Sequence, residues 1–201
     1  MKIVLVRHGE TLWNAQGRLQ GREDVPLNET GLKQAKAAGK ALSQYPFSGR
    51  GPVIISSPLQ RASQTARMIA GELPVVAALR EDAVLLERDY GAGAGRTRQE
   101  LAQLYPQSDF PGLEDRAIAE ARIVEGIRRL ALEADGQDLI LVSHGEICHI
   151  FLAFLRGEAT QTGRSALRNA SISTLEFADG EFRIEYYNQS AEELTEILNT
   201  I

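Results

Sequence analysis

Residues 1–11 read MKIVLVRHGET, an apolar run that ends at once in charged and polar residues. Ile3–Val6 is short, continuous and rich in β-branched side chains, which predicts a strand buried on both faces. The pattern returns at Leu139–Val142, which runs into residues 143–146, SHGE. The chain therefore uses one motif, V-x-H-G-E, twice. Strands buried on both faces belong to parallel sheets that helices cover, so this motif predicts an α/β fold.

Residues between and after these runs have the period of amphipathic helices. Helices are expected over residues 30–44, after Pro58, over residues 114–134, and after Gly145. The side chains expected on their inward faces are Leu32, Ala35, Gly39 and Leu42; Leu59, Ala62, Ala66 and Ile69; Ile123, Ile127, Leu130 and Ala134; and Ile147, Ile150, Phe151 and Phe154.

The remaining signals complete the predicted architecture. Val53–Ile55 is a further short strand, after which Ser57 suits an N-cap and Pro58 the first helical position. Two late strands, 171–177 and 181–187, flank Asp179-Gly180, a hairpin signal because its turn needs positive φ. The sequence predicts a single domain over residues 1–201. Its fold is three-layer α/β/α, a mainly parallel sheet with helices on both faces and an antiparallel edge strand.

Composition excludes several classes of protein. The chain has 201 residues and a net charge of −5, without the basic balance of a general nucleic-acid binder. Cys148 is the one cysteine, so neither an internal disulfide nor a cysteine zinc cage is expected. P-loop, dinucleotide-binding and H-E-x-x-H motifs are missing, and no metal or other cofactor is expected. No run is long enough for a signal peptide or a membrane span, so we expect a cytoplasmic protein without membrane partners.

Two of the three histidines follow a predicted strand and precede a glycine. In parallel sheets ligands bind at the carboxyl ends of the strands. One His-Gly pair there is typical of an ordinary turn, but two pairs beside Arg7 favour a functional site. Neutral imidazole is a nucleophile, and the guanidinium fork matches phosphate oxygens. The histidines His8 and His144, with Arg7, therefore predict a site for an anionic electrophile.

Two further side chains are candidates for this site. Arg61 lies in the first turn of its predicted helix, where a cation is unfavourable unless an anion binds at the helix N-terminus. A solvated surface arginine is the competing interpretation. An acid is also needed to protonate a leaving group, and Glu87 is the best-placed candidate. On spacing alone Asp82, Asp89 and Glu10 compete with it.

The chain resembles the histidine phosphatase superfamily, which has the phosphoglycerate mutase-like fold. The RHGET pentapeptide at residues 7–11 is similar to the family signature. Further blocks match in order over roughly residues 1–190, and together they are far more specific than any one alone. These blocks are residues 11–14, 17–21, 24–27, 31–35, 56–62, Glu87 with Gly91, 143–145 and 169–173.

This resemblance implies phosphoryl transfer through a phosphohistidine, without a metal. It implies that His8 is the nucleophile and that Glu87 protonates the leaving oxygen and then helps water attack. Arg7, Arg61 and His144 would hold the phosphoryl oxygens. The other residues expected to bind the substrate are Asn14, Gln20, Gly21, Tyr90, Arg98 and the backbone at Gly145. Glu87 can act as an acid only if burial raises its pKa against the nearby arginines.

The chain departs from the family pattern in two places. Ala94 stands where many relatives have an acidic residue, and residues 146–149, EICH, replace a sequence that more often contains glycine or valine. These departures affect loop geometry and the mouth of the pocket, but not the residues assigned to the chemistry.

Three functions remain open. The first is a phosphatase for small phosphorylated metabolites, which the compact chain favours. The second is a 2,3-bisphosphoglycerate-dependent phosphoglycerate mutase, which residues 87–91, ERDYG, resemble locally. The third is a non-catalytic domain that binds a phosphorylated ligand. Specificity is expected from the first loop and from residues 97–120, and the chain is expected to be a monomer or a homodimer.

Overall fold

The computed structural model describes residues 1–107, 109–158 and 167–200. Within them, six strands form one sheet in the order β3-β2-β4-β1-β5-β6. The first four strands are parallel to one another, and β5 and β6 are antiparallel to their neighbours. The strands are β1 (Lys2–Arg7), β2 (Val53–Ser56), β3 (Leu79–Glu81), β4 (Leu139–Ser143), β5 (Ile172–Ala178) and β6 (Glu181–Gln189).

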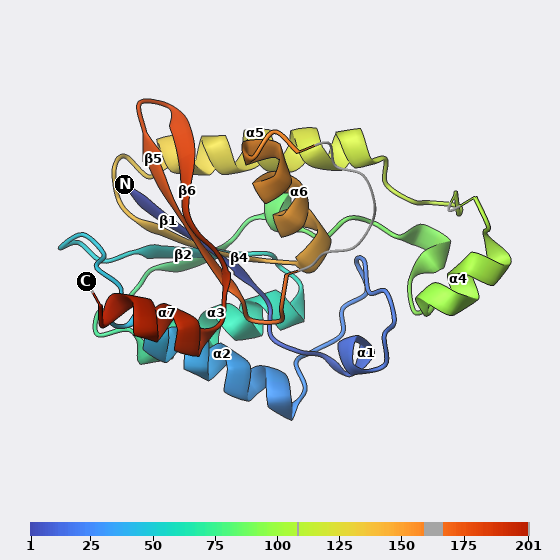
Figure 1. Cartoon of the computed structure of the whole chain (residues 1–201), viewed down its shortest axis with the longest axis horizontal. Coiled ribbons are helices and arrows are strands. Elements are labelled where there is room, and N and C mark those ends of the chain that lie inside the picture. Colours follow the sequence, from blue (N-terminus) through green and yellow to red (C-terminus); the bar gives the residue numbers. More distant parts are fainter. Residues whose placement is uncertain (108, 159–166, 201) are drawn as a thin grey trace.

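Helices cover both faces of this sheet (Figure 1). One layer contains α5 (Arg116–Glu133) and α6 (Gly145–Leu155), and the other contains α2 (Glu29–Leu42), α3 (Gln60–Glu72) and α7 (Ala191–Leu198). This confirms the predicted three-layer α/β/α fold. The other helical segments are short: α1 (Leu12–Ala15), α4 (Arg98–Leu104) and the 3₁₀ turns Ala83–Leu85 and Gly91–Gly93.

The strand that opens the chain is buried on both of its faces. Ile3 and Leu5 pack in the core below α5 and α6, whereas Val4 and Val6 pack against α2, α3 and α7. Successive side chains of a strand point to opposite faces, so a continuous apolar run fits only between two helical layers. Arg7, at the end of β1, is in register with Ser143 at the end of β4. Both copies of the V-x-H-G-E motif therefore leave the sheet side by side.

The predicted hairpin forms at one edge of the sheet. Asp179 and Gly180 both have positive φ, 53° and 80°, as a two-residue hairpin turn requires. β5 joins the hairpin to β1, and β6 is the antiparallel edge strand. The opposite edge is β3, a three-residue exposed strand that the sequence analysis did not predict.

Of the side chains expected on inward helix faces, two are exposed and Ala134 is only partly buried. Leu32 is 39% exposed and Phe154 is 44% exposed, so each lies at the edge of its helix's apolar stripe. The stripe of α2 is made instead by small residues, including Gly31, Ala35 and Ala38. These small residues let α2 pack closely against α3 and α7, and Leu42 is the large side chain buried at the end of the stripe.

The predicted start of α3 is also wrong. The helix begins at Gln60 rather than Pro58, and its N-cap residue, Leu59, offers no side-chain acceptor. The backbone N–H of Gln60 donates instead to Asp24 Oδ1, 2.7 Å away on the first long loop. Ser57 Oγ accepts the backbone N–H of Leu59 at 3.3 Å, just before the helix, and it also contacts His144.

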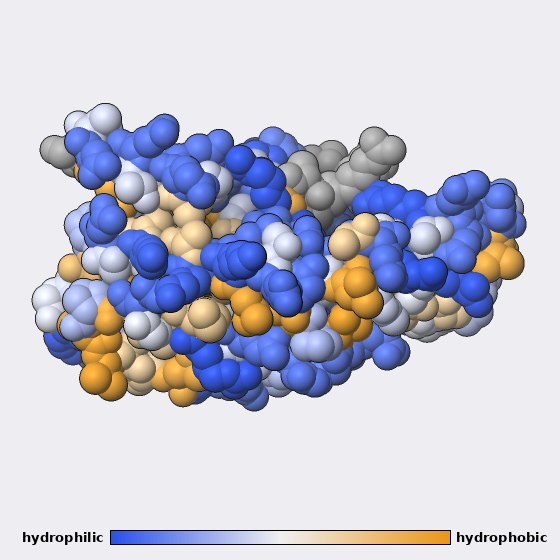
Figure 2. All heavy atoms as spheres, turned by 90° about the horizontal axis from the view of Figure 1, so that it is seen from below, coloured by the Kyte–Doolittle hydropathy of each residue, from blue (hydrophilic) through white to orange (hydrophobic). Residues whose placement is uncertain are grey.

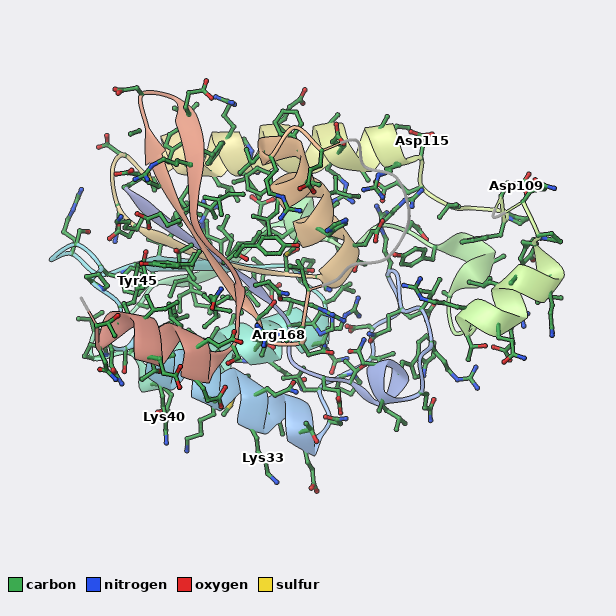
Figure 3. All side chains as sticks on the ribbon, in the orientation of Figure 1. Lys33, Lys40, Tyr45, Asp109, Asp115 and Arg168 are labelled. Carbon is green, nitrogen blue, oxygen red and sulfur yellow. The ribbon has the colours of Figure 1, made fainter. Side chains whose placement is uncertain are left out.

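Polar side chains cover the outer faces of the helices. Lys33 and Lys40 project from α2 away from the sheet, and Asp115 caps the start of α5 (Figure 3). Seen from the side of α2 and α7, the surface is largely hydrophilic, with separate apolar areas (Figure 2). In the described part of the chain, no helix combines the length and the apolar composition needed to cross a membrane.

Candidate active site

The carboxyl ends of β1, β2 and β4 meet at one edge of the sheet, where a cavity of about 180 Å³ opens. Ten of its fourteen lining residues are site residues that the sequence analysis predicted. The complete lining is Arg7, His8, Asn14, Gly17, Arg18, Leu19, Gln20, Gly21, Arg61, Glu87, Tyr90, Arg98, Gly145 and Glu146. Among the predicted site residues, His144 alone is outside this lining.

His8 is buried and electrically neutral. Its Nδ1 lies 2.6 Å from the carbonyl oxygen of Gly9, which can only accept a hydrogen bond. Nδ1 must therefore carry the proton, and Nε2 keeps its lone pair. Burial, followed by the charges of Arg61 and Arg7, lowers the pKa of His8 well below its ordinary value. The imidazole is thus an unprotonated nucleophile at neutral pH.

Arg61 is fully buried, the opposite of the solvated arginine that was the competing interpretation. Its Nη1 and Nη2 donate to the carbonyl oxygens of Glu23 and Gly21, at 2.6 and 2.7 Å. Burial lowers the pKa of Arg61 to about 10, which leaves it charged at neutral pH. The first loop therefore fixes this cation in the wall of the cavity.

Arg7 supplies a second positive charge and is partly buried. Its Nη1 donates to the carbonyl of Leu167, while its Nε is buried without a hydrogen-bond partner among the described residues. An unsatisfied buried N–H is costly, and an anionic ligand would remove that cost. The two arginines make the cavity electropositive.

His144 lies behind Arg61 rather than in the cavity wall. Its Nδ1 accepts a hydrogen bond from Arg61 Nε at 3.1 Å, so its Nε2 must donate to Ser57 Oγ at 2.7 Å. Its ring centroid is 5.2 Å from that of His8. Burial lowers the pKa of His144 well below its ordinary value. Both ring nitrogens of His144 contact protein groups, and its predicted contact with a phosphoryl oxygen stays a prediction.

Glu87 is 7% exposed and caps the N-terminus of α6. Its carboxylate accepts hydrogen bonds from the backbone N–H groups of Arg88, Glu146 and Ile147 at 3.0–3.2 Å. Burial is the largest influence and raises the pKa of Glu87, and the charge of Glu146 acts in the same direction. Arg61 and the N–H donors oppose this rise. Burial therefore prevails over the arginines, as proton donation by Glu87 requires.

The first loop brings two predicted substrate-binding residues to the cavity. Asn14 Oδ1 accepts hydrogen bonds from the backbone N–H of Thr11 and from Asn169 Nδ2, which leaves its own amide N–H groups toward the cavity. Gln20 is buried, and its Oε1 accepts a hydrogen bond from Thr11 Oγ1 at 2.9 Å. Thr11 thus orients both amides.

The other substrate-binding candidates close the cavity from the side of the 86–98 loop. A Cβ on Gly21 would lie 3.0 Å from the backbone nitrogen of Tyr90, so the two loops approach at this glycine. Arg98 begins α4 at the exposed rim, and Gly145 begins α6. All of them line the same cavity.

The sequence analysis missed three side chains that shape the site. Asn169 holds the backbone of His8 and the amide of Asn14, Ser57 holds His144, and Glu146 lines the cavity. The position of Ser57 after a strand was a usable signal, but capping seemed to explain it. Glu146 repeats the place of Glu10 in the motif, yet Glu10 does not line the cavity. The repeated V-x-H-G-E motif therefore predicts the path of the backbone after each strand, but not the role of its glutamate.

Two alternative chemistries find no support in the described residues. No group of three or more His, Cys, Asp or Glu side chains in ranges 1–107, 109–158 and 167–200 is arranged to hold a metal. Cys148 is buried, and burial raises the pKa of its thiol to about 12. The thiol is therefore protonated at neutral pH and is a packed core group.

Known proteins resemble this chain over most of its length. The chain is 33% identical over 186 residues to the uncharacterized phosphatase PhoE of Bacillus subtilis, which covers 92% of this chain and 93% of that one. It is 32% identical over 191 residues to a protein named as a probable phosphoglycerate mutase, GpmB, of Yersinia pestis, covering 89% and 86% of the two chains.

A solved structure and a family model match the chain as well. The mycobacterial glucosyl-3-phosphoglycerate phosphatase Rv2419c, in complex with VO3, superposes with a TM-score of 0.79 at 26% identity, covering 94% of this chain and 99% of that one. The model of the histidine phosphatase superfamily, branch 1, matches residues 3–190. The chain therefore belongs to branch 1 of the histidine phosphatase superfamily.

Proposed function

We propose that this protein is a metal-independent phosphatase that hydrolyses phosphomonoesters of small metabolites through a phosphohistidine on His8. One observation carries the proposal. A neutral imidazole with its Nε2 lone pair free lies in a cavity that the buried Arg61 and the partly buried Arg7 make electropositive. Such a cavity attracts the phosphoryl group and stabilises it while charge redistributes.

In the first step, His8 Nε2 forms a bond to phosphorus as the bond from phosphorus to the leaving oxygen breaks. The proton of Glu87 passes to that oxygen, and the alcohol departs. In the second step, a water molecule attacks phosphorus and the P–N bond breaks. The Glu87 carboxylate takes a proton from this water, so inorganic phosphate, neutral His8 and protonated Glu87 are restored.

The surrounding groups hold the phosphoryl oxygens in this proposal. Arg7 and Arg61 provide charge and directed N–H groups, while the Asn14 amide and the Gly145 backbone complete the cradle. His144 orients Arg61, and its direct contact with a phosphoryl oxygen stays a prediction. Gln20, Gly21, Tyr90 and Arg98 would face the remainder of the substrate.

Phosphoglycerate mutase is the second candidate function, and the likeness to GpmB favours it. The same side chains would serve, but the phosphoryl group would return to the substrate rather than to water. Product analysis with 3-phosphoglycerate, with and without 2,3-bisphosphoglycerate, separates the two. Free phosphate is expected. Isomerisation without phosphate release would make the mutase the correct assignment.

Covalent trapping tests the mechanism. Protein quenched during turnover of a ³²P-labelled phosphomonoester should carry acid-labile label on His8, and the variant His8→Ala should carry none. Release of p-nitrophenolate from p-nitrophenyl phosphate should be the same with and without a chelator. Label on another side chain would refute the mechanism, and no turnover of any phosphomonoester would favour the non-catalytic ligand-binding domain.

A further inference from the structure

Two acidic residues, Glu87 and Glu146, come together at the first turn of α6 and line the same cavity. Glu146 is the second residue of this helix, and its backbone N–H donates to Glu87 Oε2 at 3.2 Å. Its own side chain is 3% exposed and lines the cavity. The residue that binds the Glu87 carboxylate through its backbone therefore places a second acidic side chain in the same wall.

Arginines outside the phosphoryl-binding group hold the Glu146 side chain. Oε1 of Glu146 lies 2.8 Å from Arg116 Nη1, at the start of α5, and 4.0 Å from Arg88 Nη1. Arg116 does not line the cavity. The buried Glu146 side chain is therefore paired with a cation, as a buried carboxylate needs.

Several layers place charged or titratable groups around Glu87. These groups come from β1, α3, the 86–90 loop, α5, α6 and the residues next to them. They are Arg7, His8, Arg61, Arg88, Tyr90, Arg116, Arg122, His144, Glu146 and Cys148. The arginines favour ionised Glu87, and the histidines are neutral. Burial raises the pKa of Tyr90 and Cys148, so both keep their protons. Within this group, Glu146 is the member that carries negative charge.

We propose that Glu146 is a positioning residue whose charged carboxylate keeps the proton on Glu87, against the surrounding arginines, until Glu87 gives it to the leaving oxygen. The inference rests on the proposed function. Like charges close together cannot both ionise easily, and Arg116 decides which of the two does so. Glu146 keeps its charge through the ion pair, and Glu87 keeps its proton.

The pH profile of kcat/KM is the readout that a merely structural role would not move. For β-glycerophosphate, whose alkoxide is a poor leaving group, the alkaline limb reports the acid that must be protonated. The variant Glu146→Gln removes the charge but retains an oxygen that can accept from Arg116. Its alkaline limb should move to lower pH by about one unit, because a nearby like charge shifts a carboxyl pKa by that order.

Two control variants accompany this measurement. Glu146→Asp retains the charge and should restore most of the wild-type limb. Glu185→Gln removes another partly buried carboxylate, paired with Lys2 at 2.7 Å on the hairpin, and should leave the limb where it is. Ionisation of the substrate's phosphate is common to all the proteins and cancels in the comparison.

The outcomes separate the two proposals. Wild-type protein that releases no phosphate overturns the proposed function. If the wild-type protein is active and folded Glu146→Gln has an unshifted alkaline limb, only this inference is overturned. A KM increase of Glu146→Gln that is confined to amine-bearing substrates would also overturn it, because Glu146 would then be a substrate ligand. Infrared difference spectra of wild-type protein against Glu87→Gln provide a test that needs no folded Glu146 variant. A protonated carboxyl band at neutral pH is expected, and an ionised Glu87 there would refute the role.

Discussion

Replacing Glu87 by glutamine separates proton donation from every other property of this side chain. The carboxylate accepts N–H groups from Arg88 and Ile147 on Oε1 and from Glu146 on Oε2. A glutamine oxygen placed at Oε1 keeps the first two bonds, while the amide NH₂ group then opposes the N–H of Glu146. The variant therefore loses one hydrogen bond, which costs about 1 kcal/mol of unfolding free energy. In a chain of this length, that lowers Tm by about 2–4 °C.

The expected effect on catalysis is much larger and depends on the leaving group. For β-glycerophosphate, kcat/KM of Glu87→Gln should fall ~10²–10⁴-fold, or about 3–5 kcal/mol of transition-state stabilisation. For p-nitrophenyl phosphate, kcat/KM should change little, because p-nitrophenolate leaves without a proton. Its kcat should still fall, since the second step needs Glu87 as a base. A burst of p-nitrophenolate equal to the enzyme concentration should then precede slow turnover.

Rapid-quench kinetics with both substrates decides the matter, with labelled phosphohistidine measured in parallel. Equal losses of kcat/KM on the two substrates would refute proton donation and make the role of Glu87 structural. A fall in Tm of ~10 °C or more would also refute the reasoning. The three N–H contacts of Glu87 would then stabilise the fold by far more than the one lost hydrogen bond, and the side chain would have a mainly structural role.

Three further predictions concern the frame around the site. Gly31→Ala should destabilise the fold by about 1–3 kcal/mol, because its Cβ would lie 2.1 Å from a backbone oxygen. Gly71→Ala, with open space at that position, should stabilise α3 by about 0.5–1 kcal/mol; equal effects in urea unfolding would refute the packing argument. Arg61→Lys should lower kcat/KM ~10²–10³-fold, because an ammonium cannot serve one imidazole and two carbonyls in these directions; near-normal steady-state rates would contradict this. His8 and His144 stay neutral when folded but bind protons when unfolded below about pH 6.5, so unfolding free energy should fall as pH drops through that value. Urea titrations should show a smaller fall in His144→Gln, and an unchanged slope would count against the burial of a neutral His144.

The strands and the main layers were predictable because burial on two faces leaves a direct trace in the sequence. Ile3–Val6 and Leu139–Val142 contain no polar residue, and only a sheet covered on both sides accommodates such runs. The hairpin was equally predictable, since Asp179-Gly180 suits a turn with positive φ at both residues. Local chemistry decides these elements, and tertiary packing agrees with it.

Features that depend on partners distant in sequence were not predictable. Ser57 looked like a cap because local rules favour it, but Asp24, on another loop, binds the first turn of α3. Leu32 fits the helical period but lies at the edge of a face that small residues occupy. β3 is too short and too exposed to leave a pattern.

In the candidate site, too, features set by local sequence were predictable and features set by distant partners were not. The positions of His8 and Arg7 came from strand ends, and both line the cavity. Spacing alone left Glu87 among several acids, and only the resemblance to a family singled it out. The contacts of His144 with Arg61 and Ser57 join the segments that follow two different strands, β4 and β2, so no local pattern contains them.

The main chain, rather than side chains, ties the first loop to Arg61. The guanidinium of Arg61 donates hydrogen bonds to the backbone carbonyl oxygens of Gly21 and Glu23, atoms that every amino acid possesses. The exposed side chain of Glu23 can thus diverge without displacing Arg61, whereas Arg22 also pairs with Asp89 and Glu114. Insertions and deletions are different, because they would displace the carbonyls themselves. Evolution can therefore retune what this enzyme scaffold recognises by point substitution along a loop of constant length.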